Sequence, residues 1–78
     1  MELQLTQLPK HIRHRRPELI PLIIEKAKQK EYITIHDVIE LDTSYKTARI
    51  LLNYLTQIGI LDMFVLGNVK VYKLKKKQ

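Results

Sequence analysis

Hydrophobic residues recur at helical spacing in three successive stretches between residues 17 and 58. In the first stretch, an apolar face follows Pro17 or Pro21. Either proline suits the first turn of a helix, where its missing N–H has no helical partner. The face consists of Leu19, Ile20, Leu22, Ile23, Ile24 and Ala27. The pattern predicts a first helix whose start stays open between the two prolines.

A second, shorter helix is predicted to begin after Thr34. Thr34 is a suitable N-cap, and Asp37 stands three residues later, as in a weak capping box. The apolar positions of this helix are Ile35, Val38, Ile39 and Leu41. The segment Asp42-Thr43-Ser44 then interrupts the periodicity, because these residue types favour turns and caps.

The third predicted helix runs from residue 45 to about residue 58, with Ser44 as its cap. Its apolar face is the most regular of the three and consists of Ala48, Leu51, Leu52, Leu55 and Ile58. Gly59 follows directly, which is typical of a helix that ends in a left-handed residue.

Two runs of β-forming residues complete the chain, at 60–66 and 69–74. Between them Gly67-Asn68 predicts a two-residue turn of type II′, with glycine first. This register pairs Leu66 with Val69, Phe64 with Val71, Asp62 with Lys73, Val65 with Lys70, Met63 with Tyr72 and Leu61 with Leu74. We expect Leu61, Met63, Tyr72 and Leu74 to face the helices. The opposite face then carries Phe64, Leu66, Val69 and Val71.

The charge of the chain is concentrated at its two ends. The net charge of the 78 residues is +6, of which residues 1–16 contribute +3 and residues 67–78 contribute +5, whereas residues 17–66 carry −2. Basic terminal segments commonly meet polyanions. We therefore divide the chain into a basic arm at 1–16, a folded domain at 17–74 and a basic tail at 75–78. Because cysteine is absent, aliphatic packing must supply the core.

Several classes of function are not expected. The chain has no apolar run of about 20 residues and no signal-peptide pattern, so we expect a cytoplasmic protein that does not enter a membrane. The two glycines cannot form a phosphate loop, and no nucleophile–base pair is evident, so we expect no enzyme and no cofactor. His11 and His14 lie three residues apart, but the positive charges around them disfavour a metal site.

The stretch from Ser44 to Leu61 resembles the recognition helix of the winged helix-turn-helix family. It combines a serine cap with Ala48, Leu52, Leu55 and Gly59 at the family's spacing, and Val71-Tyr72-Lys73-Leu74 resembles the last wing strand. The resemblance covers residues 17–74. It implies an α+β, mainly α fold with three helices and a two-stranded wing. The small size is similar to that of compact archaeal or archaeal-virus transcription regulators.

The resemblance implies binding of double-stranded DNA, with the third helix in the major groove. Arg49 is expected to read guanine and Asn53 adenine, whereas Lys46 contacts a base or a phosphate. Hydroxyl and ammonium groups would contact phosphate oxygens. These come from Thr43, Ser44, Tyr45, Lys70, Lys73 and Lys75. Ser44 is also explained by its role as a cap. The wing tip lacks arginine, which puts a minor-groove contact in doubt.

The outer face of the wing suggests a further partner, because an apolar patch on a small protein usually marks an interface. The candidate interface residues are Leu3, Leu5, Phe64, Leu66, Val69 and Val71. The segment around Leu3 and Leu5 could cover this patch, but we favour a homodimer. Two alternatives remain: an adaptor that binds a protein through the wing, or nonspecific DNA binding dominated by the basic ends.

Overall fold

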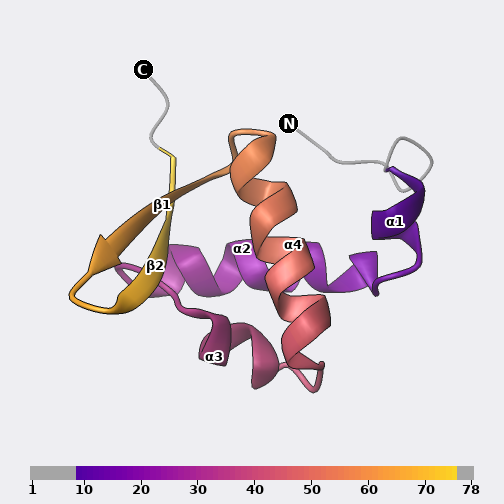
Figure 1. Ribbon diagram of the computed structural model, residues 1–78, viewed down its shortest axis with the longest axis horizontal. Coiled ribbons are helices and arrows are strands. Elements are labelled where there is room, and N and C mark those ends of the chain that lie inside the picture. The colour runs from indigo at the N-terminus through magenta and orange to yellow at the C-terminus, as the bar shows by residue number, and fades with distance from the viewer. Residues whose placement is uncertain (1–8, 76–78) are drawn as a thin grey trace.

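The computed structural model describes residues 9–75 of the chain. These residues form an α+β structure in which helices precede a two-stranded antiparallel hairpin at the C-terminal end (Figure 1). The elements are the helices α1 (Lys10–Arg13), α2 (Ile20–Gln29), α3 (Ile35–Ile39) and α4 (Tyr45–Gln57), the 3-10 helix η2 (Pro17–Leu19), and the strands β1 (Leu61–Leu66) and β2 (Val69–Leu74). The predicted α+β class is therefore confirmed, with one short helix, α1, that was not expected.

Both prolines that could open the first helix are used. Pro17 is the first residue of η2, and Pro21 lies in the first turn of α2, which directly continues η2. Each proline occupies a position whose N–H has no partner in a regular helix. The two candidate starts thus belong to one continuous helical segment whose first turn is tighter than the rest.

The predicted caps of α3 and α4 are present. The backbone N–H of Thr34 donates to Asp37 Oδ2 at 2.8 Å, which is the reciprocal arm of a capping box. Ser44 Oγ accepts the backbone N–H of Thr47 at 3.2 Å. These bonds satisfy N–H groups that have no partner inside their helices.

Helix α4 also ends as predicted. Gly59 adopts a left-handed conformation with φ of +85°. The N–H of Ile60 then reaches the carbonyl of Leu55 at 2.9 Å, and the N–H of Gly59 reaches that of Thr56 at 3.2 Å. This pair of bonds is the Schellman motif, which turns the chain directly from α4 into β1.

The hairpin has the predicted register at all six pairs, from Leu61–Leu74 to Leu66–Val69. Gly67 has φ of +62°, while Asn68 is not among the residues with positive φ, so the turn has glycine first as expected of type II′. Ile33 adds a bridge to β2: its N–H donates to Tyr72 O at 2.9 Å, and the N–H of Tyr72 donates to Ile33 O at 2.8 Å.

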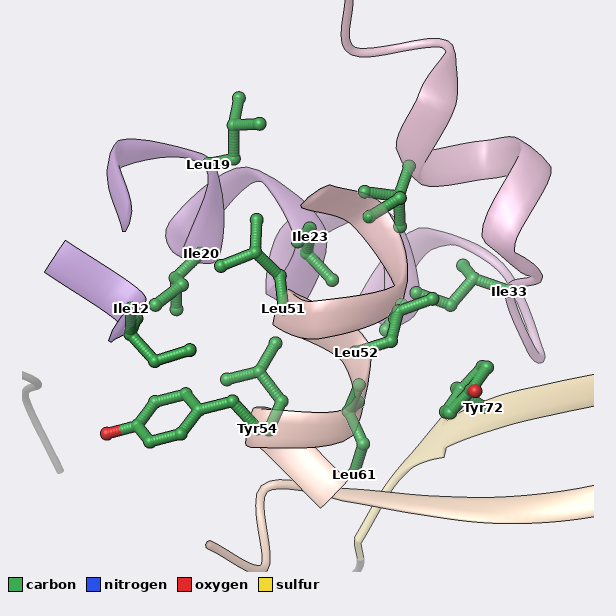
Figure 2. Packing of buried hydrophobic residues seen from close by; sticks show 14 residues of the cluster. Ile12, Leu19, Ile20, Ile23, Ile33, Leu51, Leu52, Tyr54, Leu61 and Tyr72 are labelled. Atoms are coloured by element: carbon green, nitrogen blue, oxygen red, sulfur yellow. The ribbon is translucent and has the colours of Figure 1, made fainter. Parts of the chain in front are cut away.

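Helix α4 crosses α2, and the core fills the space between them and the base of the hairpin (Figures 1 and 2). The largest fully buried side chains are Ile12, Ile23, Ile33, Val38, Leu51, Leu52, Leu55 and Leu61. Ile12 comes from α1 and packs in this cluster near Tyr54 of α4 (Figure 2). The basic stretch that we placed in an arm thus contributes an anchor to the core.

The two faces of the hairpin differ from the expectation at two positions. Leu61 and Tyr72 are buried against the helices as predicted, but Met63, which lies opposite Tyr72 on β1, is 42% exposed. The hairpin extends beyond the helices toward its tip (Figure 1). Val71, expected on the outer face, is only 3% exposed. The bridge at Ile33 brings Tyr32 beside β2, where Tyr32 lines the same hollow as Val71. Burial therefore differs between the two strands as well as between the two faces, because β2, which is bridged to Ile33, is more buried than β1.

Candidate nucleic-acid interface

A groove of about 570 Å³ lies between the start of α3, the outward face of α4 and the tip half of the hairpin. We call it the polar groove. Its lining residues are Thr34, Ile35, His36, Tyr45, Arg49, Asn53, Asn68, Val69, Lys70 and Tyr72. Three elements that are distant in the sequence therefore contribute side chains to one concave surface.

The α4 side of the polar groove consists of Tyr45, Arg49 and Asn53. They are spaced four residues apart and so follow one stripe along the helix. Their outward direction is set by Ala48 and Leu52, which are fully buried in the core. The structure thus brings Arg49 and Asn53 together as predicted. Lys46 is exposed but does not line the groove. Of the three α4 residues expected to contact DNA bases, the groove therefore contains Arg49 and Asn53 but not Lys46.

The hairpin side is formed by its tip and by β2. Asn68, Val69 and Lys70 lie at the rim, and Tyr72 lies deeper. Burial raises the pKa of Tyr72 and nearby Tyr45 raises it further, which outweighs the opposing effect of Arg49. Tyr72 therefore keeps its proton at neutral pH and presents a neutral hydroxyl.

The remaining predicted lysines lie elsewhere. Lys73 lines a second hollow on the opposite face of the hairpin. Lys75 is exposed just after β2, where its backbone N–H donates to Ile60 O at 3.0 Å. Lys76 and Lys77 lie outside the described residues. Of the predicted hairpin and tail lysines in residues 9–75, only Lys70 shares the groove with Arg49.

The electrostatic character of the polar groove is positive. Arg49 and Lys70 both line it, and no carboxylate does so in the described part of the chain. Neither cation forms a hydrogen bond or an ion pair with another residue between 9 and 75. Their donors are therefore available for an external acceptor. An anionic ligand with many acceptors, such as a nucleic-acid backbone, suits this arrangement.

The turn between α3 and α4 lies at the N-terminal end of α4, next to Tyr45. Ser44 is engaged as the cap of α4, Thr43 is half-buried, and Asp42 has a left-handed φ of +66°. Arg16 donates from Nη1 to the carbonyl of Asp42. This contact holds Arg16, at the end of the basic segment 10–16, beside the turn before α4, which the sequence pattern did not reveal.

Five groove residues were not predicted as site residues: Thr34, Ile35, His36, Asn68 and Tyr72. The hairpin register could have indicated Tyr72 as a groove residue, because it places Tyr72 on the same face as Lys70. No local pattern places the first turn of α3 beside the hairpin tip. His36 therefore joins the groove only through the packing of α3 against α4 and of Ile33 against β2.

The apolar surface predicted on the outer face of the hairpin is present in part. Phe64, Leu66 and Val69 are exposed, whereas Val71 is buried. Leu3 and Leu5 lie outside the described residues. The hollow on this face measures about 380 Å³ and is lined by Glu31, Tyr32, Phe64, Val65, Leu66, Val71 and Lys73.

Comparisons with protein-family models, with curated proteins and with solved structures gave no match. Between residues 9 and 75, no three side chains of histidine, cysteine, aspartate or glutamate are grouped as metal ligands would be. In the same range, every helix is too short or too polar to cross a membrane.

Proposed function

We propose that this chain is a winged helix-turn-helix protein that binds double-stranded DNA, with α4 in the major groove and the hairpin as the wing. Two features of the architecture support this proposal. Helices α3 and α4 are joined by a short turn, and a hairpin follows α4 directly. A helix of the length of α4 fits the major groove, with its first half toward the base edges.

The observation that carries the proposal is the direction of Arg49. Its side chain lines a groove without described carboxylates and is not paired within residues 9–75. Its charge is therefore not neutralised by any carboxylate between residues 9 and 75. The guanidinium fork can donate to both O6 and N7 of guanine.

The neighbouring residues take roles that follow from their positions. Asn53 lies one turn further along α4 and can read adenine through its amide. Tyr45 and Lys70 lie at the start of the helix and at the wing, where phosphate oxygens of the two strands would pass. Lys46 and Thr43, outside the groove, would contact the backbone beside the helix. We infer a sequence-specific regulator of transcription from this division between base-reading and phosphate-binding groups.

The test is selection of bound sequences from a random pool of duplex DNA, followed by competition binding with the selected site. Arg49→Ala should weaken binding to that site by about 5-fold to 150-fold, the equivalent of one bidentate base contact of ~1–3 kcal/mol. Binding to random DNA should change much less. Lys28→Ala, which removes an exposed charge on α2, is the matched control and should leave specificity unchanged.

The salt dependence separates specific from nonspecific binding. Affinity for any duplex should fall steeply with salt, by roughly one counterion for each neutralised phosphate. Retention of DNA without an enriched motif, unaffected by Arg49→Ala, would favour nonspecific binding by the basic ends. Failure to retain DNA at low salt would contradict the proposal.

A further inference from the structure

Strand β1 has an open outer edge. The sheet order places β2 between β1 and the bridging residue Ile33. Both edges of β2 are therefore paired, whereas the outer edge of β1 has no pairing partner in residues 9–75. An open edge is a template for another strand.

The ladder shows which backbone groups lie at this edge. Tyr72 uses its N–H and its C=O on Ile33, so it points both groups away from β1. In an antiparallel pair, hydrogen-bonded and non-hydrogen-bonded positions alternate. Met63, opposite Tyr72, is therefore at a non-hydrogen-bonded position. The N–H and C=O groups of Met63, and of Val65 two residues later, point to the outer edge.

The side chains along this edge lack the features that usually protect an edge strand. Residues 63–66 are Met-Phe-Val-Leu, without charge, proline or glycine. All four side chains are between 42% and 59% exposed. Protected edges normally carry lysine, proline or a bulge. This edge is instead apolar on both faces of the sheet.

We propose that two copies of the chain pair through their β1 edges as antiparallel strands, which gives one continuous four-stranded sheet. The segment is self-complementary about Phe64. With Phe64 opposite its own copy, each Met63 faces a Val65, and the outward N–H and C=O groups of these residues exchange hydrogen bonds. Asp62 falls opposite Leu66, so the two carboxylates do not face each other.

Self-complementarity and the absence of charge indicate a second copy as the occupant. The strip 63–66 is uncharged, so two copies can meet here without placing like charges opposite each other. The pairing also leaves the polar groove open, because that groove is lined by β2 and the hairpin tip and not by β1.

The interface is one strand wide and smaller than a standard interface, so we expect a dissociation constant in the micromolar range. Sedimentation equilibrium without DNA measures it, so the result does not depend on the proposed function. Val65→Pro removes one outward N–H but no bond of the β1–β2 ladder, and should weaken the dimer at least about tenfold. Val65→Thr keeps the N–H and a β-branched shape, and should stay within about threefold of the original.

A disulfide test keeps the proposal falsifiable if Val65→Pro does not fold. The chain has no cysteine, so any disulfide formed by a variant with a single introduced cysteine must join two copies of the chain. Opposed Cα atoms at a non-hydrogen-bonded pair are about 4.5 Å apart, which a disulfide can span. Under oxidised glutathione, Phe64→Cys should form a covalent dimer much faster than Val69→Cys, an equally exposed position on β2.

Three results would overturn the proposal. A chain that stays monomeric at several hundred micromolar has no such interface, and its edge would be free for a strand of another protein. A dimer that Val65→Pro leaves unchanged uses a different surface. Equal rates of cross-linking for Phe64→Cys and Val69→Cys would exclude pairing through β1.

Discussion

At the scale of single residues, Asp37 joins two helices through its carboxylate. It accepts the backbone N–H of Thr34 at the start of α3 and a hydrogen bond from Lys30, just after α2. Burial by itself would raise the pKa of Asp37. The bonds from Lys30 and Thr34, together with the charges of Lys30 and Lys26, outweigh burial, so that the pKa lies below its ordinary value. The folded state therefore favours the ionised form.

Stability should fall in acid through Asp37. Its pKa is lower in the folded than in the unfolded chain, so its contribution is complete above the unfolded value of about 4 and is lost as pH falls through the folded value. Asp37→Asn should reduce stability at pH 7 by about 1 kcal/mol, as loss of a capping contact does. It should also flatten the fall below pH 5. Urea unfolding at several pH values measures both effects.

The control for this prediction is Glu25→Gln, which neutralises an exposed carboxylate on α2. It should leave the urea midpoint nearly unchanged at pH 7. If Asp37→Asn had the same midpoint and the same pH profile as the original chain, the carboxylate would not tie Lys30 to Thr34 in solution.

The outward residues of α4 show what can be predicted from the spacing of single residues. Helical spacing alone places Arg49 and Asn53 opposite the buried Ala48 and Leu52, and the structure agrees. The same reasoning indicated DNA contacts for both Tyr45 and Lys46. Both lie near the outward face of α4, and the position of the hairpin decides which of them borders the groove.

At the scale of elements, the end of α4 sets the direction in which the hairpin leaves the helices. Gly59 holds φ of +85° there, and no atom lies within 4 Å of the site that a Cβ would occupy. A substitution at this position thus meets backbone strain without a steric clash.

Gly59→Ala should lower the free energy of unfolding by about 1 kcal/mol, the cost of a left-handed conformation for an L-residue. Urea denaturation followed by circular dichroism measures the loss. Gln57→Ala, an exposed change two residues earlier, is the control and should be nearly neutral. Equal midpoints for Gly59→Ala and the original chain would mean that the Schellman turn contributes nothing to the stability of α4.

At the scale of the whole molecule, the N-terminal basic segment is attached to the core at two points. Ile12 is fully buried among residues of α4, and Arg16 donates to the carbonyl of Asp42 in the turn before α4. Positive charges at positions 10, 13, 15 and 16 are thereby held on the domain and near α4.

Ile12→Ala should destabilise the protein by about 2–4 kcal/mol, because it removes buried methyl groups and leaves a cavity. A domain of this size has a total stability of roughly 4–12 kcal/mol, so this single change should bring it close to unfolding at elevated temperature. Thermal melting and urea unfolding provide the measurement. Leu22→Ala, at a half-exposed position on α2, should cost much less. Similar losses for the two variants would show that α1 is not docked in solution.

The features that can be predicted from the chain alone are local ones. The caps at Thr34 and Ser44, the glycine after α4, and the register set by Gly67-Asn68 all depend on residues within a few positions of each other, so their patterns are legible along the chain. Only the tertiary structure decided which surfaces these elements cover. Ile12 entered the core, Val71 was buried near Tyr32, and Met63 stayed exposed. His36 reached the polar groove in the same way. Each of these outcomes depends on contacts between segments far apart in sequence, and neither periodicity nor composition specifies how such segments pack together.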